Sequence, residues 1–276
     1  MKIQPYFKLT RFQNNLITFV SVLIGGLAGG VASWPRLILS AISAAFISAG
    51  GYVINDYFDL EIDKINRPLR VLPTGDLSQK RAFIFSCCLF TTGFILSFFL
   101  KPVSVGIALI TIIFLCLYSA KFKREFLIGN VTVSLLSGLA FVYGGVFSKN
   151  WEISLIPAIL AFLFHMGREL IKDMEDLQGD KALKSETFPI VYGVRNSQFL
   201  VSAIFLILII LTIFPYKLKI FSIYYLILAL IMDFVLFYII VSLWNNPSRE
   251  NLGSLSRLLK FEMLLGLLAI FAGTFG

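Results

Sequence analysis

Long apolar runs constrain the fold of this chain more than any other feature of its sequence. Hydrophobic residues make up 58% of the 276 residues, whereas charged residues make up only 14%. About 20 apolar residues are enough to cross a bilayer as a helix, and a helix satisfies its own backbone hydrogen bonds in lipid. The sequence therefore predicts an all-α, polytopic membrane protein, with residues 1–276 in a single domain.

Nine apolar segments have the length expected of a membrane span. Polar residues, prolines and glycines separate them. The predicted transmembrane helices comprise residues 14–32, 37–60, 82–100, 103–120, 127–147, 153–175, 197–215, 220–243 and 257–275.

The distribution of Lys and Arg predicts the orientation of these helices, because basic residues are enriched in cytoplasmic loops. When the N-terminal arm and every second loop are assigned to one side, that side receives 19 of the 24 Lys and Arg. We therefore expect a multi-pass protein of the cell membrane with a cytoplasmic N-terminus and an outer C-terminus. The longest polar segments share the cytoplasmic side, where we expect cap loops over the bundle; they are 61–81, 121–125, 176–196 and 244–256.

The net charge of +8 indicates contact with anionic lipid rather than with nucleic acid. The basic residues follow the cytoplasmic rim and form no stripe of the kind that binds DNA. The sequence indicates a lipid bilayer as partner, no nucleic acid and no obligatory protein partner.

One acidic pattern occurs twice in this apolar chain. Nine of the 16 Asp and Glu residues lie between 56 and 63 or between 169 and 180. Each segment carries three Asp at positions i, i+3 and i+7, a spacing that predicts three carboxylates on one helical face. Both copies are expected at the same membrane face, so they can share a site; they are Asp56, Asp59 and Asp63, and Asp173, Asp176 and Asp180.

Clustered carboxylates in an apolar chain require a compensating cation. Oxygen-only ligands suit Mg²⁺, which usually completes its coordination shell with water and substrate phosphate. We therefore expect a diphosphate held by Mg²⁺ between the two motifs, with its hydrophobic tail among the helices. The natural reaction is heterolysis of an allylic carbon–oxygen bond, and basic residues at the same level can neutralise the leaving group.

Several polar residues near the same membrane face have both an ordinary and a functional interpretation. Asn14 is either an interfacial anchor or a site residue, and Asn55 either a local cap or a partner of Asp59 four residues on. Tyr118 and Ser119, with Lys121 three residues after Tyr118, are either interfacial anchors or diphosphate contacts. The basic residues available to a diphosphate are Arg67, Arg70, Lys121, Lys123, Arg168, Lys172 and Lys181.

Three segments together carry a family resemblance. They are NDYFDLEIDKINRP, the later YSAKFKR, and KDMEDLQGDKALKSETFPIVYG. With them the chain resembles the UbiA superfamily of intramembrane prenyltransferases over nearly its whole length. Within this superfamily it looks most like the archaeal-type geranylgeranylglyceryl phosphate geranylgeranyltransferases, also called digeranylgeranylglyceryl phosphate synthases.

The resemblance implies a Mg²⁺-dependent transfer of a geranylgeranyl group from its diphosphate to the hydroxyl of 3-O-geranylgeranylglyceryl 1-phosphate, in ether-lipid biosynthesis. It implies that Asn55 joins the six Asp of the two motifs in binding diphosphate and metal. It also implies phosphate contacts for Arg67, Tyr118, Lys121 and Lys172. Two departures from the family pattern concern the loops: RPLRVLPTG replaces RPxRPIPSG, and Phe122 interrupts a Tyr-x-x-x-Lys element.

Two alternatives remain at the level of the sequence. The acceptor could be aromatic, such as a hydroxybenzoate or quinone precursor, which needs fewer basic residues than a lipid phosphate. We expect Lys123 and Arg124 to contact an acceptor phosphate. From another functional class, a transporter of a divalent cation or phospholipid remains open, although transporter sites usually lie near mid-membrane on broken helices.

Overall fold

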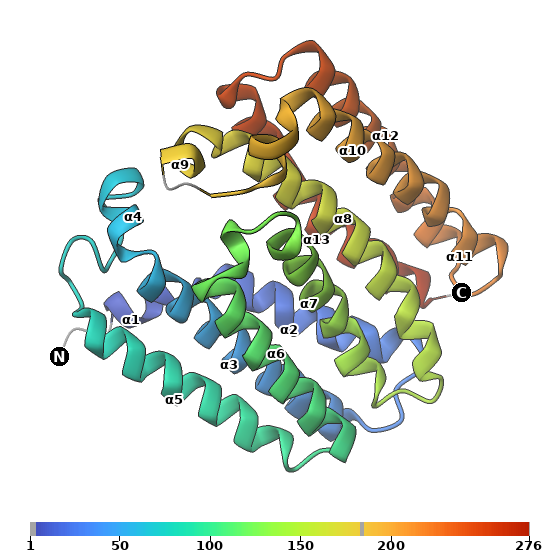
Figure 1. Cartoon of the computed structure of the whole chain (residues 1–276). Helices are drawn as coiled ribbons and strands as arrows, with labels where there is room; N and C mark the ends of the chain where they lie inside the picture. Colours follow the sequence, from blue (N-terminus) through green and yellow to red (C-terminus); the bar gives the residue numbers. More distant parts are fainter. Residues whose placement is uncertain (1–3, 183–184, 276) are drawn as a thin grey trace.

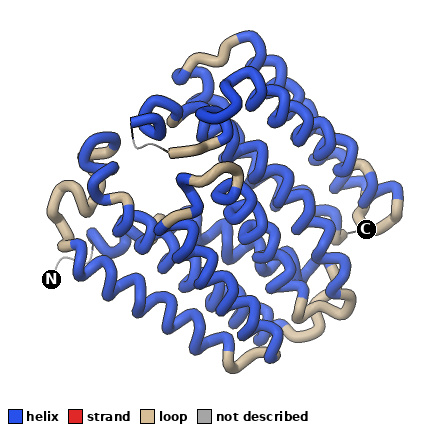
Figure 2. The backbone as a smooth tube through the Cα atoms, viewed as in Figure 1, coloured by secondary structure: helices blue, strands red, loops and turns tan. Residues whose placement is uncertain are grey.

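The computed structural model describes residues 4–182 and 185–275, and the chain forms a helical bundle without β-strands in these ranges (Figure 2). Each of the nine segments predicted to be helical overlaps a long helix. Their bounds are α2 Phe12–Ala28, α3 Trp34–Phe58, α5 Gln79–Ser97, α6 Pro102–Ala120, α7 Ile128–Gly145, α8 Leu155–Glu175, α10 Phe188–Thr212, α12 Ile223–Asn245 and α13 Arg249–Gly273.

Seven helical segments within the described ranges are long and apolar enough to cross a membrane. The helix α2 is shorter, with 17 residues, and α13 carries five charged residues in its first 14 positions. The chain is thus a multi-pass membrane protein. The seven segments are Trp34–Phe58, Gln79–Ser97, Pro102–Ala120, Ile128–Gly145, Trp151–Glu175, Phe188–Lys217 and Ile223–Asn245.

Short helices at the ends of the long ones escape prediction, because three to seven residues are too few to show a periodic pattern. Two of them, α4 and α9, lie at the same end of the bundle (Figure 1). The short elements are α1 Gln4–Leu9, α4 Leu60–Asn66, η1 Phe122–Arg124, η2 Trp151–Ser154, α9 Leu177–Ala182 and α11 Phe214–Lys217.

Two predicted boundaries are wrong by about two turns of helix. The helix α10 begins at Phe188 rather than at residue 197, because Pro189 lies in its first turn, where proline suits a helix. Gly193, with φ 84°, kinks this helix without ending it. The helix α13 begins at Arg249 rather than at 257, after the Ser248 side chain caps the backbone N–H of Asn251.

Small residues allow the central helices to approach closely. A Cβ atom added at Gly144 of α7 would collide with the carbonyl oxygen of Val22 in α2, and one at Gly25 with that of Phe141. Such contacts replace the hydrophobic driving force that helices lack in lipid. A closed set of contacts runs from α2 through α7 and α8 to α13 and back to α2, while α3 packs against α2 and α6 packs against both α3 and α7. These helices line the cavity that holds the candidate site.

Candidate active site

The two acidic motifs have the same backbone geometry. The helix α3 ends at Asp59, with φ −89° and ψ 1°, and α8 ends at Asp176, with φ −90° and ψ 4°. A short helix follows each break, so the third Asp of each triad lies in α4 or α9. This differs from the expected continuous helical face. The hydrogen bonds from the Asp63 N–H to the Asp59 carbonyl (2.7 Å) and from the Asp180 N–H to the Asp176 carbonyl (3.0 Å) preserve the i to i+4 alignment.

Both motifs line one cavity of about 840 Å³. The carboxylates of Asp59 and Asp63 reach it from α3 and α4, and those of Asp173, Asp176 and Asp180 from α8 and α9. The rest of the wall contains both polar side chains and an extensive apolar part. Its apolar residues include Ile17, Ile47, Leu115, Leu136, Phe141, Leu160, Phe164, Leu236 and Leu267.

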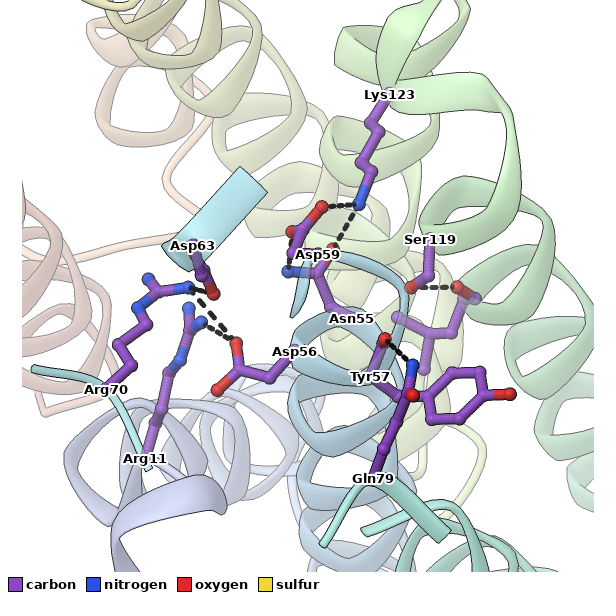
Figure 3. A network of polar contacts seen from close by, with 11 residues as sticks. Arg11, Asn55, Asp56, Tyr57, Asp59, Asp63, Arg70, Gln79, Ser119 and Lys123 are labelled. Atoms are coloured by element: carbon purple, nitrogen blue, oxygen red, sulfur yellow. Dashed lines mark hydrogen bonds and ion pairs between the residues drawn. The ribbon is translucent and has the colours of Figure 1, made fainter. Parts of the chain in front are cut away.

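Arginines bind two carboxylates of the first motif (Figure 3). The Arg11 guanidinium donates to Asp56 Oδ1 at 2.5 Å, and Arg70 donates to Asp63 Oδ2 at 2.6 Å and to Asp56 Oδ1 at 3.3 Å. The segment after α4 therefore folds back onto the motif, and Val71 in this segment is buried. Burial raises the pKa of Asp63, and Arg70 opposes this rise.

Lys123 of η1 completes the first motif. Its ammonium group pairs with Asp59 Oδ1, and Asn55 donates to Asp59 Oδ2 at 2.9 Å. Burial lowers the pKa of Lys123, while the carboxylate of Asp59 acts in the opposite direction. Each Asp of the first motif thus has a cationic partner.

The second motif has a different set of partners. Asp173 accepts a hydrogen bond from the neutral amide of Asn130 in α7 at 2.7 Å. Within the described ranges, Asp176 and Asp180 form no ion pair. Burial, and next the negative charge of Asp176, raise the pKa of Asp180 to about 6. This half of the site carries negative charge without a paired cation.

Glu169 lies one turn deeper on α8 than Asp173. Its carboxylate accepts from Arg168 Nη1 at 3.0 Å and from Lys172 Nζ at 2.8 Å. The trio carries a net charge of about +1, since two cations share one carboxylate. It places two cations beside the acidic second motif.

The donor set fits Mg²⁺ chemically. It consists of carboxylate oxygens, and no group of three His, Cys, Asp or Glu in the described chain converges closely enough to enclose an ion by itself. Mg²⁺ commonly takes one or two carboxylates and completes its octahedron with water and phosphate oxygens. A cavity lined by carboxylates on opposite sides offers such partial coordination.

The structure brings most of the predicted site residues to the cavity. Asp56, Lys121 and Lys181 are the exceptions. Asp56 turns toward Arg11 and Arg70, the exposed Lys121 pairs with Glu125 at 3.1 Å, and Lys181 is exposed on α9. The predicted residues that line the cavity are Asn14, Asn55, Asp59, Asp63, Arg67, Arg70, Tyr118, Ser119, Lys123, Arg124, Arg168, Lys172, Asp173, Asp176 and Asp180.

Two partners of the acidic motifs escape the sequence analysis. Arg11 lies 45 positions before Asp56, and Asn130 lies 43 positions before Asp173. No local spacing links residues so far apart. For Asn130 a signal does exist, since a buried amide inside an apolar span needs a partner.

Comparison with known proteins decides the family. Residues 16–264 match the model of the UbiA prenyltransferase family. The chain belongs to this family. The resemblance noted in its sequence is therefore confirmed, and the chain is a prenyltransferase by family.

Curated relatives cover nearly the whole of this UbiA family member. The digeranylgeranylglyceryl phosphate synthase of Methanococcus aeolicus is 39% identical and covers 99% of both chains. That of Methanocaldococcus jannaschii is 37% identical and covers 99% of this chain and 96% of the relative.

Solved structures agree with this fold. One, described as a digeranylgeranylglyceryl phosphate synthase in membranes, is 36% identical with a TM-score of 0.79 over 99% of this chain and 98% of the other. A UbiA homolog from Archaeoglobus fulgidus, bound to GPP and Mg²⁺, is 19% identical with a TM-score of 0.68 over 97% and 99%. At this identity the second likeness supports the fold alone.

Proposed function

We propose that this protein transfers a geranylgeranyl group from geranylgeranyl diphosphate to the free hydroxyl of 3-O-geranylgeranylglyceryl 1-phosphate. One observation carries the proposal: two acidic motifs from distant parts of the chain line one cavity that also has an extensive apolar wall. A prenyl diphosphate has the same division into a charged head and an apolar tail. The names of the full-length relatives support this choice of donor and acceptor.

The carboxylates of both motifs would hold Mg²⁺ against the donor diphosphate. We assign this role to Asp59 and Asp63 in the first motif and to Asp173, Asp176 and Asp180 in the second. Asp56 belongs to the same triad but is held between Arg11 and Arg70, so we assign it to keeping α4 in position. Bound Mg²⁺ supplies Lewis-acid stabilisation of the leaving diphosphate.

Residues around the motifs orient the donor and neutralise its charge. Asn55 and Lys123 fix the two oxygens of Asp59, which leaves that carboxylate with little rotational freedom. Hydrogen bonds from cations to phosphate are short and strong, and this suits Lys172 as a contact to the diphosphate. Other contacts to the donor are proposed for Arg67, Tyr118 and Ser119.

The apolar wall protects the reaction from water. The bond between C1 of the donor and the bridging oxygen breaks, and the diphosphate leaves with the electron pair. The acceptor hydroxyl attacks the allylic cation at C1, and its proton passes to the released diphosphate as the ether bond forms. Water in the same place would produce a free alcohol instead.

We extend the proposal to the topology of the chain. All nine long helices would cross the membrane, α2 and α13 included, within one domain of residues 1–276. The basic loops put the N-terminus and the site on the cytoplasmic side and the C-terminus outside. The two shorter or more polar helices, α2 and α13, belong to the closed set of helix contacts that lines the cavity.

A competition between acceptors tests the proposed function. Purified protein in lipid nanodiscs receives geranylgeranyl diphosphate, Mg²⁺ and equal amounts of 3-O-geranylgeranylglyceryl 1-phosphate and 4-hydroxybenzoate. We expect the doubly alkylated glycerol phosphate as the product, identified by mass spectrometry. A prenylated hydroxybenzoate would support the aromatic alternative, and transport of Mg²⁺ or lipid without either product would support a carrier.

A further inference from the structure

A second group of polar residues lines the cavity about two turns deeper than the middle Asp of each motif. It comprises Tyr52 of α3 and Arg168 of α8. Asn14 of α2 and Arg11 at the start of α2 line the same cavity, and Arg11 also binds Asp56 of the first motif. Tyr52 precedes Asp59 by seven residues and Arg168 precedes Asp176 by eight, which places them about 10 to 12 Å farther along their helices. Tyr52 and Arg168 therefore lie deeper in the cavity than the middle Asp of each motif, and Arg11 links the two levels through Tyr52 and Asp56.

Arg11 is held over the cavity by three features. Its backbone is left-handed, with φ 49°, a conformation that costs a residue with a side chain about 1 kcal/mol or more. Its guanidinium carbon lies 5.1 Å from the centre of the Tyr52 ring, and one of its nitrogens binds Asp56. The ring and the carboxylate together fix the direction of the guanidinium group.

Arg168 lines the same cavity as Tyr52, from helix α8. The Glu169 carboxylate accepts a hydrogen bond from Nη1 of Arg168. Nε of Arg168, in contrast, is buried and has no hydrogen-bond partner within the described ranges. A buried guanidinium N–H without a partner is costly, so a ligand oxygen there would be stabilising.

These residues differ chemically from the two motifs. The motifs offer carboxylates, which bind an anion only through a metal ion. The deeper group, together with Arg11 and Asn14, offers guanidinium, amide and hydroxyl donors, the groups that bind phosphate oxygens directly. One cavity thus contains one place suited to a metal diphosphate and another suited to a free phosphate.

We propose that Arg11 and Arg168, with Asn14 and Tyr52 between them, bind the phosphate of the acceptor. This inference rests on the proposed function, because it requires an acceptor that carries a phosphate. The donor tail extends from the diphosphate into the apolar part of the cavity, so C1 lies on the membrane side of the two motifs. A glycerol phosphate anchored two turns deeper keeps its hydroxyl beside C1. Lys123, which the sequence favours for this phosphate, pairs with Asp59 instead.

The test compares two acceptors that differ only in the phosphate. Initial rates are measured with 3-O-geranylgeranylglyceryl 1-phosphate and with 3-O-geranylgeranylglycerol, for the wild type and for Arg168→Ala. We expect kcat/KM for the phosphorylated acceptor to fall about 10- to 100-fold, the size of a hydrogen bond to a charged group. The rate with the phosphate-free acceptor and the KM for the donor should change less than about twofold.

Two further variants complete the design. Arg168→Gln keeps a side-chain amide that can donate to Glu169. If Arg168→Ala does not fold, the same two acceptors are compared with Arg168→Gln. Arg195→Ala removes an exposed arginine from α10 and is the matched control, expected to behave as the wild type.

The outcomes separate the two proposals. A wild-type protein that forms no ether product from either acceptor overturns the proposed function and this site with it. Wild-type turnover combined with an Arg168 defect of equal size for both acceptors, or a matching rise in the donor KM, overturns the site alone. Selective loss with the phosphorylated acceptor supports it.

Discussion

The two acidic motifs have nearly the same backbone geometry but differ in the residues that pair with their carboxylates. Both helices break at the middle Asp with nearly identical torsion angles, and a short helix follows each break. In the first motif, Arg11, Arg70 and Lys123 pair with the carboxylates. In the second, Asp173 has a neutral partner, and Asp176 and Asp180 form no ion pair in the part of the chain that the structure describes.

This difference suggests a division of work between the motifs. Carboxylates that already have cationic partners gain less from a metal ion, because their charge is largely compensated. The second motif has more charge to neutralise. We therefore infer that it makes the larger contribution to Mg²⁺ affinity, while the first motif contributes more to the shape and stability of the site.

The largest predicted effect is the loss of an unpaired carboxylate. In Asp176→Asn we expect kcat to fall about 10²- to 10³-fold, as for the removal of one group that stabilises a charged transition state. The Mg²⁺ concentration for half-maximal rate should also rise. Steady-state rates over a Mg²⁺ titration measure both effects. An unchanged rate at every Mg²⁺ concentration would remove Asp176 from the mechanism.

Asp56→Asn should act on stability more than on chemistry. Breaking a buried ion pair leaves its partner charge uncompensated, here that of Arg11, at a cost of about 3 kcal/mol, whereas Arg70 keeps its ion pair with Asp63. Thermal unfolding in detergent should therefore begin at a lower temperature. The folded fraction should keep the Mg²⁺ dependence of the wild type; a shift like that of Asp176→Asn would place Asp56 among the metal ligands.

The sequence does not predict most of the differences between the two motifs. The apolar runs predict where nearly all long helices lie, and the doubled Asp spacing predicts two motifs in one site. The partners that distinguish the motifs come from helices far away in the chain, such as Arg11 for Asp56 and Asn130 for Asp173. Spacing carries no information about such contacts. The breaks at Asp59 and Asp176 involve neither Gly nor Pro, so the sequence contains no signal for them either.

Lys123 and Lys121 provide a matched pair for the first motif. Lys123 is largely buried beside Asp59, with its side chain 13% exposed, whereas that of Lys121 is 70% exposed. Lys123→Ala should raise the donor KM about tenfold, because a hydrogen bond to a charged group is lost. Lys121→Ala removes a solvent-exposed ion pair worth about 0 to 1 kcal/mol and should change the KM little. Donor titrations decide between them, and the reverse order would restore Lys121 to the site.

Asn130→Ala is expected to have the smallest effect. It removes the amide that orients Asp173, at a cost of about 1 kcal/mol, and should reduce kcat a few-fold. Asn130→Asp adds a negative charge at the same place and should be more harmful. If both variants match the wild type in rate, the orientation of Asp173 has no part in turnover.

The most direct test of a shared diphosphate site is the binding of a donor analogue. A thiolodiphosphate analogue of geranylgeranyl diphosphate resists ionisation, so its dissociation constant reports binding without reaction. We expect tight binding by the wild type only with Mg²⁺, and weaker binding by both Asp59→Asn and Asp176→Asn. Equal binding with and without Mg²⁺, or undiminished binding by either variant, would contradict a site in which the two motifs hold one diphosphate.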